Sequence, residues 1–188
     1  MIKIGITGSL ASGKTTASKI LSNRRGPLFS ADKAVKELYK NNHFKSLIGR
    51  RFKIKNNNQL KKSLKNLILK NKDNIKKLEK IIHPLVRKKM KSFTSQNRNK
   101  RLLFYEIPLL IESKLMKNFN VIIFIKAKKK LRLRRFQSKS ANKKLFNLLN
   151  KKQLNDAKKI KFCDHVVVNE KNLIVLKKNL LDIIDKYE

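Results

Sequence analysis

Short apolar runs alternate with amphipathic stretches along most of the chain. Runs typical of buried parallel strands cover residues 2–6, 27–31, 101–107, 121–125 and 165–168. Stretches with apolar residues at helical spacing follow them at 16–23, 32–40, 59–91, 129–149 and 172–184, with a break near 138–142. This alternation predicts an α/β fold, with a mostly parallel sheet flanked by helices and ligands at the carboxyl ends of its strands.

The longest helical stretch stands apart because no strand interrupts it. Its apolar residues, beginning at Leu60, fall on two helical faces. A chain of 188 residues is long enough for one α/β core with a small insertion, and too short for two nucleotide domains. We expect a single domain with a core at about 1–58 and 99–188, a helical insertion at about 59–98 and a lid at about 135–150.

A glycine-rich segment follows the first apolar run. It reads GSLASGKT from Gly8 to Thr15, and a helical stretch comes directly after it. Glycines at the two ends, Gly8 and Gly13, let backbone N–H groups turn inward around a polyphosphate, while Lys14 reaches its oxygens and Thr15 can ligate Mg²⁺. The strand before and the helix after favour a phosphate-binding loop over a plain Gly/Ser-rich turn.

Other charged side chains follow the later strands. Asp32 can orient or deprotonate an acceptor hydroxyl, or serve as a helix N-cap. Glu106 can approach a magnesium ion, or be a plain strand-end carboxylate. The basic residues Arg134, Arg135 and Lys139 suit a lid that brings a guanidinium to a transferring phosphoryl group, or a solvated helix face.

The net charge raises a different possibility. The chain has 49 Lys and Arg against 12 Asp and Glu, a formal charge of +37. The lysines are spread through every segment together with many Asn and Ile, which favours compositional drift, as in an AT-biased genome, over a selected polyanion-binding surface. Both interpretations remain open.

Composition also narrows the class of protein. Cys163 is the lone cysteine, which excludes an internal disulfide, and the three histidines show no zinc-ligand spacing. No apolar segment approaches the roughly 20 residues that span a bilayer, and the chain enters a strand at once rather than a signal peptide. We expect a cytosolic protein with no membrane partner.

Several segments together resemble the dephospho-CoA kinase family. They are GSLASGKTT, FSADKAVKEL, LEKIIHPLVR and YEIPLLIES, with the late pair Gln153 and Asn169. The HPLVR and PLL-x-E segments are more telling than the loop, which other small-molecule kinases share. The resemblance implies a P-loop kinase fold, with ATP and Mg²⁺ as cofactors, and phosphorylation of the 3′-hydroxyl of dephospho-CoA to give coenzyme A and ADP.

The resemblance also implies roles for particular residues. Asp32 matches the second acid of the family's Asp-x-Asp pattern, the base, and Arg135 matches a lid arginine. His83 belongs to the part that receives the acceptor, and Asn169 falls where the family places an asparagine near adenine. The ATP-binding loop comprises Gly8, Ser9, Leu10, Ala11, Ser12, Gly13, Lys14, Thr15 and Thr16, and the acceptor cleft includes Pro108, Leu109 and Leu110.

Two of these segments also have simpler interpretations. His83 and Pro84 could mark a helix interruption, and Pro108 to Leu110 could be core packing.

The chain departs from the family pattern at several positions. Ser30 stands in place of the first acid, and Lys139 replaces a second lid arginine, whose bidentate geometry a lysine cannot reproduce. Ala11 replaces a loop glycine, which we expect to be tolerated only if its φ stays negative. Glu170 takes the place of a glycine after Asn169. Because Lys14, Thr15 and Asp32 remain, a drifted but working enzyme is expected.

Two other functions remain compatible with the sequence. Another small-molecule kinase, acting on a nucleoside or nucleotide, would share the loop and the fold. A nucleic-acid-binding P-loop ATPase would use the basic surface. A GTPase is disfavoured because the Asn-Lys-x-Asp motif is missing. We expect ATP and dephospho-CoA as partners, no obligatory nucleic acid and a monomer.

Overall fold

The computed structural model describes residues 1–55, 59–71, 73–140 and 143–188, without the side chains of residues 139 and 140. The chain divides into two compact units, which are described separately. One comprises Met1–Ser30 and Gln96–Glu188, and the other comprises Ala31–Ser95. Within the described part of the chain, none of the helices combines the length and the apolar composition needed to span a bilayer.

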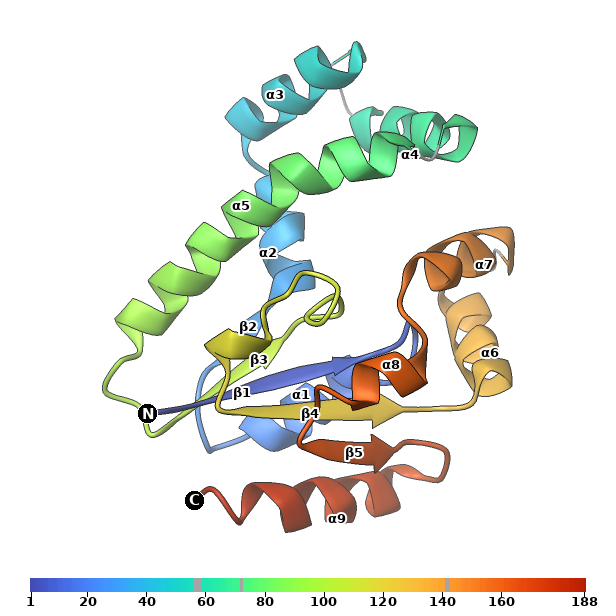
Figure 1. Ribbon diagram of the computed structural model, residues 1–188. Helices are drawn as coiled ribbons and strands as arrows, with labels where there is room; N and C mark the ends of the chain where they lie inside the picture. The colour runs from blue at the N-terminus through green and yellow to red at the C-terminus, as the bar shows by residue number, and fades with distance from the viewer. Residues whose placement is uncertain (56–58, 72, 141–142) are drawn as a thin grey trace. The chain divides into compact units, whose positions relative to one another are not determined.

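The first unit is built on a five-stranded sheet with the order β2-β3-β1-β4-β5 (Figure 1). Every neighbouring pair of strands is parallel. The predicted parallel α/β architecture is therefore confirmed. The strands are β1 (Ile2–Gly8), β2 (Leu28–Ser30), β3 (Leu102–Glu106), β4 (Val121–Lys126) and β5 (His165–Val168).

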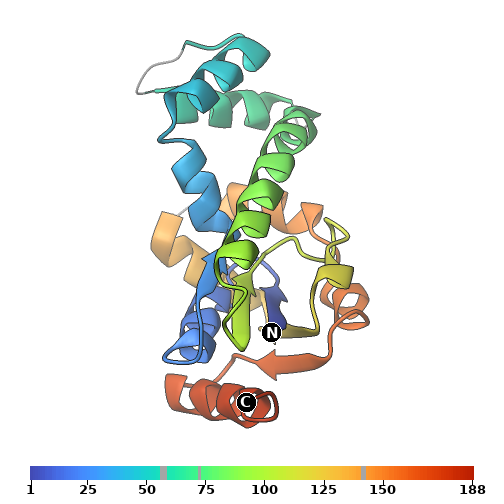
Figure 2. The same ribbon diagram turned by 90° about the vertical axis from the view of Figure 1, so that its left-hand side faces the viewer.

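One face of the sheet packs against the helices α1 (Lys14–Ser22) and α9 (Leu173–Ile184). Ile4 and Ile6 of β1 are completely buried in this core. Figures 1 and 2 show α9 running alongside β5. The alternation of side chains along β1 thus buries its even-numbered residues under these two helices.

The opposite face of β1 is covered by the segment that follows β3. Gly5 lies on this face, and a Cβ added there would be 2.7 Å from Leu110 Cδ1 and 3.1 Å from Phe119 Cγ. The ring of Phe119 also lies edge-on to Tyr105, with centroids 5.3 Å apart. Glycine at position 5 lets this segment, which includes the short 3₁₀ helix η1 (Met116–Asn118), pack closely on the strand.

The remaining helices of this unit follow β4. They are α6 (Lys129–Ser140), α7 (Lys143–Lys152) and α8 (Asp156–Ile160). The basic stretch after β4 was expected to be helical with a break near 138–142. Its described residues are helical up to 140 and again from 143, and residues 141–142 of the expected break lie outside the described part of the chain. The short α8 was not predicted from the sequence.

All the regular secondary structure in the described part of the second unit is helical. Its buried core includes Leu38, Phe44, Leu60 and Ile82. The helices are α2 (Ala31–Leu38), α3 (Asn42–Phe52), α4 (Leu60–Lys70) and α5 (Asp73–Gln96). The expected helical character of the stretch after residue 59 is confirmed, whereas α3 was not predicted.

Two local expectations are corrected. The helix α2 begins at Ala31, so Asp32 lies within its first turn and is not the N-cap. Pro84 does not interrupt α5, which continues on both sides of it. The helical compact unit begins at Ala31. The functional division into core, insertion and lid stays a prediction.

Candidate functional site

The segment predicted to be a phosphate-binding loop lies at the carboxyl end of β1 and leads into α1. Gly8 has a φ of 151°, and a Cβ there would collide with the Ile125 carbonyl oxygen. Gly13, the N-cap of α1, has a φ of 97°, and a Cβ there would collide with Asn169 Nδ2. No other residue fits either position without moving its neighbours, which agrees with the roles expected for both glycines.

Ala11 corrects the expectation for the tip of the loop. Its φ is 59°, in the left-handed region, and not negative as the sequence argument required. A side chain in this conformation costs about 1–2 kcal/mol relative to glycine. The loop therefore keeps the turn that a glycine would make, and its surroundings hold Ala11 in that conformation.

Lys14 lies across the loop rather than pointing away from it. Its Nζ donates to the Ser9 carbonyl oxygen at 2.8 Å, and the residue is only 8% exposed. The Ser12 hydroxyl is also buried, and it has no hydrogen-bond partner among the described residues. A buried ammonium and a buried hydroxyl beside the N-terminus of α1 form a site suited to an anion.

Thr15 and Glu106 meet at the edge of the sheet. The Thr15 hydroxyl donates to Glu106 Oε1 at 2.5 Å, although the two residues are 91 positions apart. Glu106 ends β3 and is only 3% exposed. A hydroxyl and a carboxylate are hard oxygen ligands, so this pair fits Mg²⁺ together with phosphate oxygens.

Larger metal-binding clusters are not found in the described residues. No group of three or more His, Cys, Asp or Glu side chains there could hold a metal ion. A magnesium ion at Thr15 and Glu106 would draw its other ligands from phosphates and water, as such ions commonly do.

Two predicted residues support the loop from outside. Asn169 Nδ2 donates to the Ser12 carbonyl oxygen at 2.9 Å, and Arg135 Nη1 donates to the same oxygen at 3.4 Å. Asn169 is buried, whereas Arg135 is half-buried in α6. Both side chains contact the expected phosphate site through its backbone.

Arg132 is a site residue that the sequence analysis missed. Its Nη1 donates to the Leu10 carbonyl oxygen at 3.3 Å and to Asn150 Oδ1 at 2.8 Å, and its Nε donates to the Ala127 carbonyl oxygen at 3.1 Å. Burial lowers the pKa of this guanidinium, while the charge of Asp156 acts in the opposite direction. It stands in a run of basic residues, and its 6% exposure and these hydrogen bonds separate it from them.

Other predicted residues lie elsewhere. Asp32, exposed in α2, and His83, half-buried in α5, both belong to the helical unit. In the other unit, the Pro108 carbonyl oxygen accepts a bond from the Thr7 hydroxyl at 3.3 Å, and Leu109 is half-buried. Leu110 is fully buried against β1, which supports core packing rather than substrate contact at that position.

Comparison with known proteins identifies the family that the sequence motifs resemble. The family model for dephospho-CoA kinase matches residues 2–174. The chain belongs to the dephospho-CoA kinase family. The dephospho-CoA kinase of Bartonella quintana is 33% identical over 97% of this chain and 96% of its own length. That of Rickettsia bellii is 31% identical over 100% and 98%.

Solved structures extend the similarity to the fold. The dephospho-CoA kinase from Campylobacter jejuni has a TM-score of 0.69 and 27% identity, covering 98% of this chain and 96% of that one. The crystal structure of TT1252 from Thermus thermophilus has a TM-score of 0.82 at 24% identity, covering 98% and 97%. The fold expected for a dephospho-CoA kinase is thus confirmed.

The structure describes the surroundings of two positions that depart from the dephospho-CoA kinase pattern. Ser30, in place of an acid, is buried at the end of β2 opposite Glu106 in the sheet register. Glu170, in place of a glycine, accepts a bond from the Lys128 N–H at 3.0 Å and pairs with its Nζ at 3.2 Å. The side chain of Lys139 lies outside the described part of the chain.

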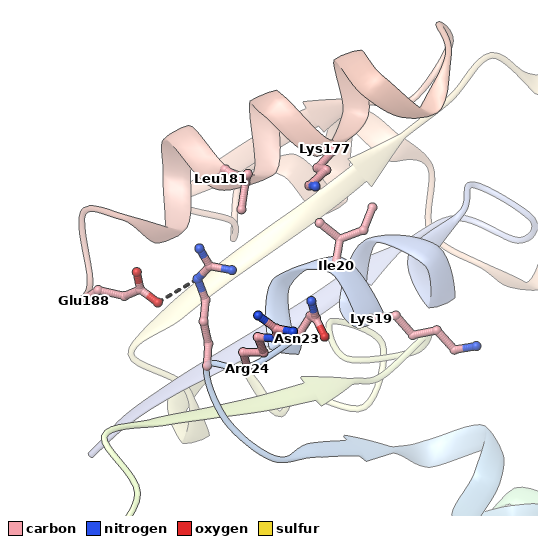
Figure 3. A pocket seen from close by; sticks show the side chains of 8 residues that line it. Lys19, Ile20, Asn23, Arg24, Lys177, Leu181 and Glu188 are labelled. Atoms are coloured by element: carbon pink, nitrogen blue, oxygen red, sulfur yellow. Dashed lines mark ion pairs between the residues drawn. The ribbon is translucent and has the colours of Figure 1, made fainter.

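A separate cavity lies at the other end of α1 (Figure 3). It measures about 760 Å³ and contains no residue of the phosphate loop. Arg25 pairs with Glu188 on its wall, at 2.6 Å between Nε and Oε1. The cavity is therefore not part of the nucleotide site. Its lining is Lys19, Ile20, Asn23, Arg24, Arg25, Lys177, Leu181 and Glu188.

The lone thiol is not a candidate nucleophile. Burial raises the pKa of Cys163 to about 12, so the thiol stays protonated at neutral pH. Its Sγ contacts the Lys159 carbonyl oxygen at 3.3 Å. Its place in the structure is consistent with a packing role.

Proposed function

We propose that this chain transfers the γ-phosphoryl group of ATP to the ribose 3′-hydroxyl of dephospho-CoA, giving coenzyme A and ADP. Membership of the family supports the overall reaction. The observation that carries the proposal is Lys14, buried across a loop whose two glycines cannot be replaced without moving Ile125 or Asn169. Such a loop binds the phosphates of a nucleotide.

In the proposed reaction, the 3′-oxygen attacks the γ-phosphorus in line. A new P–O bond forms to the ribose, the bond from the γ-phosphorus to the β–γ bridging oxygen breaks, and ADP leaves. The Asp32 carboxylate accepts the proton of the attacking hydroxyl. Lys14 and Arg135 compensate the negative charge on the transferring group.

Mg²⁺ is included in the proposal. Thr15 and Glu106 would hold the ion, because their oxygens already meet at 2.5 Å beside the loop. When bound, it neutralises charge on the phosphate oxygens.

The remaining assignments rest on the family resemblance. His83, Pro108 and Leu109 are proposed to contact the acceptor, and Asn169 to lie near the adenine of ATP. Closure of the lid at about 135–150 would exclude water that could otherwise hydrolyse ATP. A cytosolic location and a monomeric state likewise remain predictions from the sequence.

The test is a coupled ADP-release assay with ATP and Mg²⁺. Dephospho-CoA is compared with AMP, adenosine and no acceptor, and coenzyme A is identified as the product. Release that depends on dephospho-CoA supports the proposal. Release with AMP or adenosine instead would assign the chain to another small-molecule kinase, and release stimulated only by DNA or RNA would favour a nucleic-acid-dependent ATPase.

The role of Asp32 has its own test. Asp32→Asn should lower kcat by roughly 10²–10⁴-fold, because the amide cannot accept the hydroxyl proton, while ATP affinity stays nearly unchanged. The matched control is Asp73→Asn, since Asp73 is also an exposed acid in the first turn of a helix of the same unit. Near-normal turnover of Asp32→Asn would exclude it as the base.

A further inference from the structure

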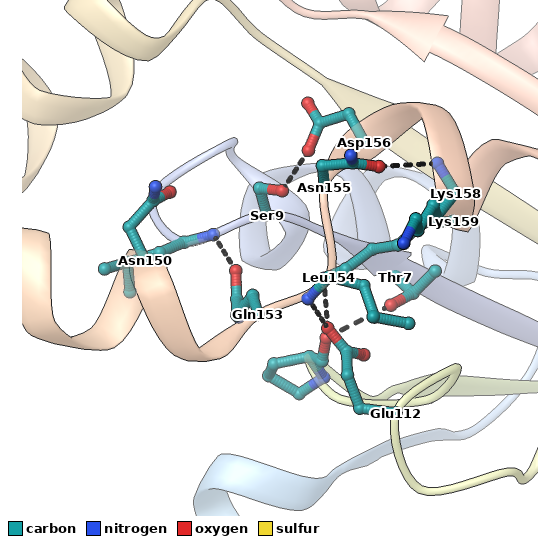
Figure 4. Close-up of polar contacts among 12 residues, drawn as sticks. Thr7, Ser9, Glu112, Asn150, Gln153, Leu154, Asn155, Asp156, Lys158 and Lys159 are labelled. Carbon is teal, nitrogen blue, oxygen red and sulfur yellow. Dashed lines mark hydrogen bonds and ion pairs between the residues drawn. The ribbon is translucent and has the colours of Figure 1, made fainter.

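The tip of the phosphate loop, Ser9–Leu10–Ala11, is tied to a distant part of the chain. The Leu10 N–H donates to Gln153 Oε1 at 2.9 Å, and the Ser9 hydroxyl donates to Asp156 Oδ1 (Figure 4). Both acceptors lie more than 140 positions further along the sequence. The loop tip is thus held by side chains that are not part of the loop.

The residues that hold the tip sit on a well-fixed segment, Gln153–Lys159, which we name the anchor segment. The Leu154 N–H donates to Glu112 Oε1 at 3.2 Å, and Asn155 caps α8 by accepting from the Lys158 N–H at 2.8 Å. Lys159 is completely buried and pairs with Glu112 at 2.6 Å. A buried ion pair of this kind is costly to break, so the anchor segment presents Gln153 from a rigid base.

The peptide groups around Leu10 are held from both sides. Its N–H is bound to Gln153, and its carbonyl oxygen accepts from Arg132, which also bonds Asn150 just before the anchor segment. The next residue, Ala11, has the left-handed φ of 59°. An unfavourable backbone conformation persists only where its surroundings hold it, and these bonds fix the residue immediately before it.

We propose that Gln153 is a positioning residue for ATP binding, which holds the Leu10 N–H, with Asp156 on Ser9, and so keeps Ala11 in the left-handed conformation that shapes the loop. The proposal rests on the proposed function only in that ATP is the ligand of the loop. It explains how this chain uses alanine where a left-handed turn favours glycine. Without the anchor, Ala11 returns to negative φ and the loop loses its shape.

The first experiment compares Gln153→Ala with Asn147→Ala, which removes an exposed amide from α7. ATP affinity is measured by titration calorimetry without any acceptor. We expect Gln153→Ala to weaken ATP binding about three- to tenfold, corresponding to one lost hydrogen bond, and Asn147→Ala to leave it unchanged. Equal affinity of Gln153→Ala and the unsubstituted protein would overturn the proposal.

The second experiment separates positioning from general destabilisation. The single variant Ala11→Gly supplies the reference ATP affinity for this experiment, because glycine adopts this φ without strain. In the Gln153→Ala background it should recover most of the lost affinity, since the loop no longer needs the anchor. If Gln153→Ala caused the same loss of affinity with and without the Ala11→Gly substitution, the proposal would be overturned.

A third measurement needs no nucleotide. Hydrogen exchange of the Leu10 amide, followed by NMR, should be faster in Gln153→Ala and remain slow in Gln153→Glu, whose carboxylate can still accept the bond. Unchanged exchange in Gln153→Ala would count against the proposal. If the protein binds ATP but does not phosphorylate dephospho-CoA, the proposed function fails while these measurements still test the role of Gln153.

Discussion

The two ends of helix α1 both carry positive charge, and they differ in how that charge is held. At the N-terminal end, Lys14 is 8% exposed and bonded to the Ser9 carbonyl oxygen. At the other end, Lys19, Arg24 and Lys177 line the cavity as exposed side chains. The first end is a site built from fixed groups, and the second is a collection of solvent-exposed cations (Figure 3).

The difference shows why net charge is a poor guide to function in this chain. An exposed lysine is screened by water and salt, and it loses conformational freedom when it binds an anion. A buried lysine beside a helix N-terminus has already lost that freedom on folding, and its charge acts in a less screened environment. The same residue type therefore contributes very differently at the two ends of one helix.

The largest expected effect comes from replacing the lysine at the N-terminal end of α1 by alanine, and the same substitution at the other end of the helix is its control. Lys14→Ala should lower kcat/KM for ATP by on the order of 10³-fold, because it removes a fixed cation from the transferring phosphoryl group. Lys19→Ala should change it by less than about twofold, since Lys19 is exposed at the far end of the helix. Both values come from the ADP-release assay.

Similar effects of the two substitutions would contradict this difference between the two ends of α1. A small effect of Lys14→Ala would mean that the loop does not bind the reacting phosphates. A large effect of Lys19→Ala, with unchanged thermal stability, would mean that the basic surface takes part in catalysis.

Much of the site at the N-terminal end of α1 was predictable from the local sequence. The spacing of Gly8, Gly13 and Lys14 requires only a strand before it and a helix after it, and both are present. Glu106 was predictable as a strand-end acid because parallel strands finish at one edge of a sheet. These features depend on short stretches of chain or on the regular geometry of strands.

The parts that were missed depend on distant contacts. In the sequence Arg132 looks like its basic neighbours, and its burial and its bonds to Leu10 and Asn150 distinguish it. The left-handed Ala11 contradicts its own backbone preference, so no local rule predicts it. The helix α8 has only five residues, too few to show a helical period, and α3 contains Gly49, a residue that is unfavourable inside a helix.

A smaller effect is expected at Thr15 and Glu106, the pair that we propose to hold Mg²⁺. Glu106→Gln keeps the shape of the side chain and removes its charge, so the Mg²⁺ concentration for half-maximal activity should rise about tenfold. Activity should return at high Mg²⁺. The measurement is a Mg²⁺ titration of ADP release at saturating ATP and dephospho-CoA.

Glu170→Gln is the matched control, because Glu170 is a carboxylate with a different partner, Lys128. It should leave the Mg²⁺ dependence unchanged. If Glu106→Gln had the same Mg²⁺ dependence as this control, Glu106 would be a structural partner of Thr15 only, and the metal would be held by other groups.

The smallest effect is expected at the cavity, and it decides between drift and a selected polyanion surface. One variant replaces Lys19, Arg24 and Lys177 by alanine, and a control replaces three exposed lysines of α4, namely Lys62, Lys65 and Lys70. If charge acts only through its total amount, both variants should elute from heparin at the same, slightly lower salt concentration. A clearly larger loss for the cavity variant would mean that these cations form a binding site for polyanions. Equal losses would leave the phosphate loop, with its buried lysine, as the end of α1 at which an anion is specifically bound.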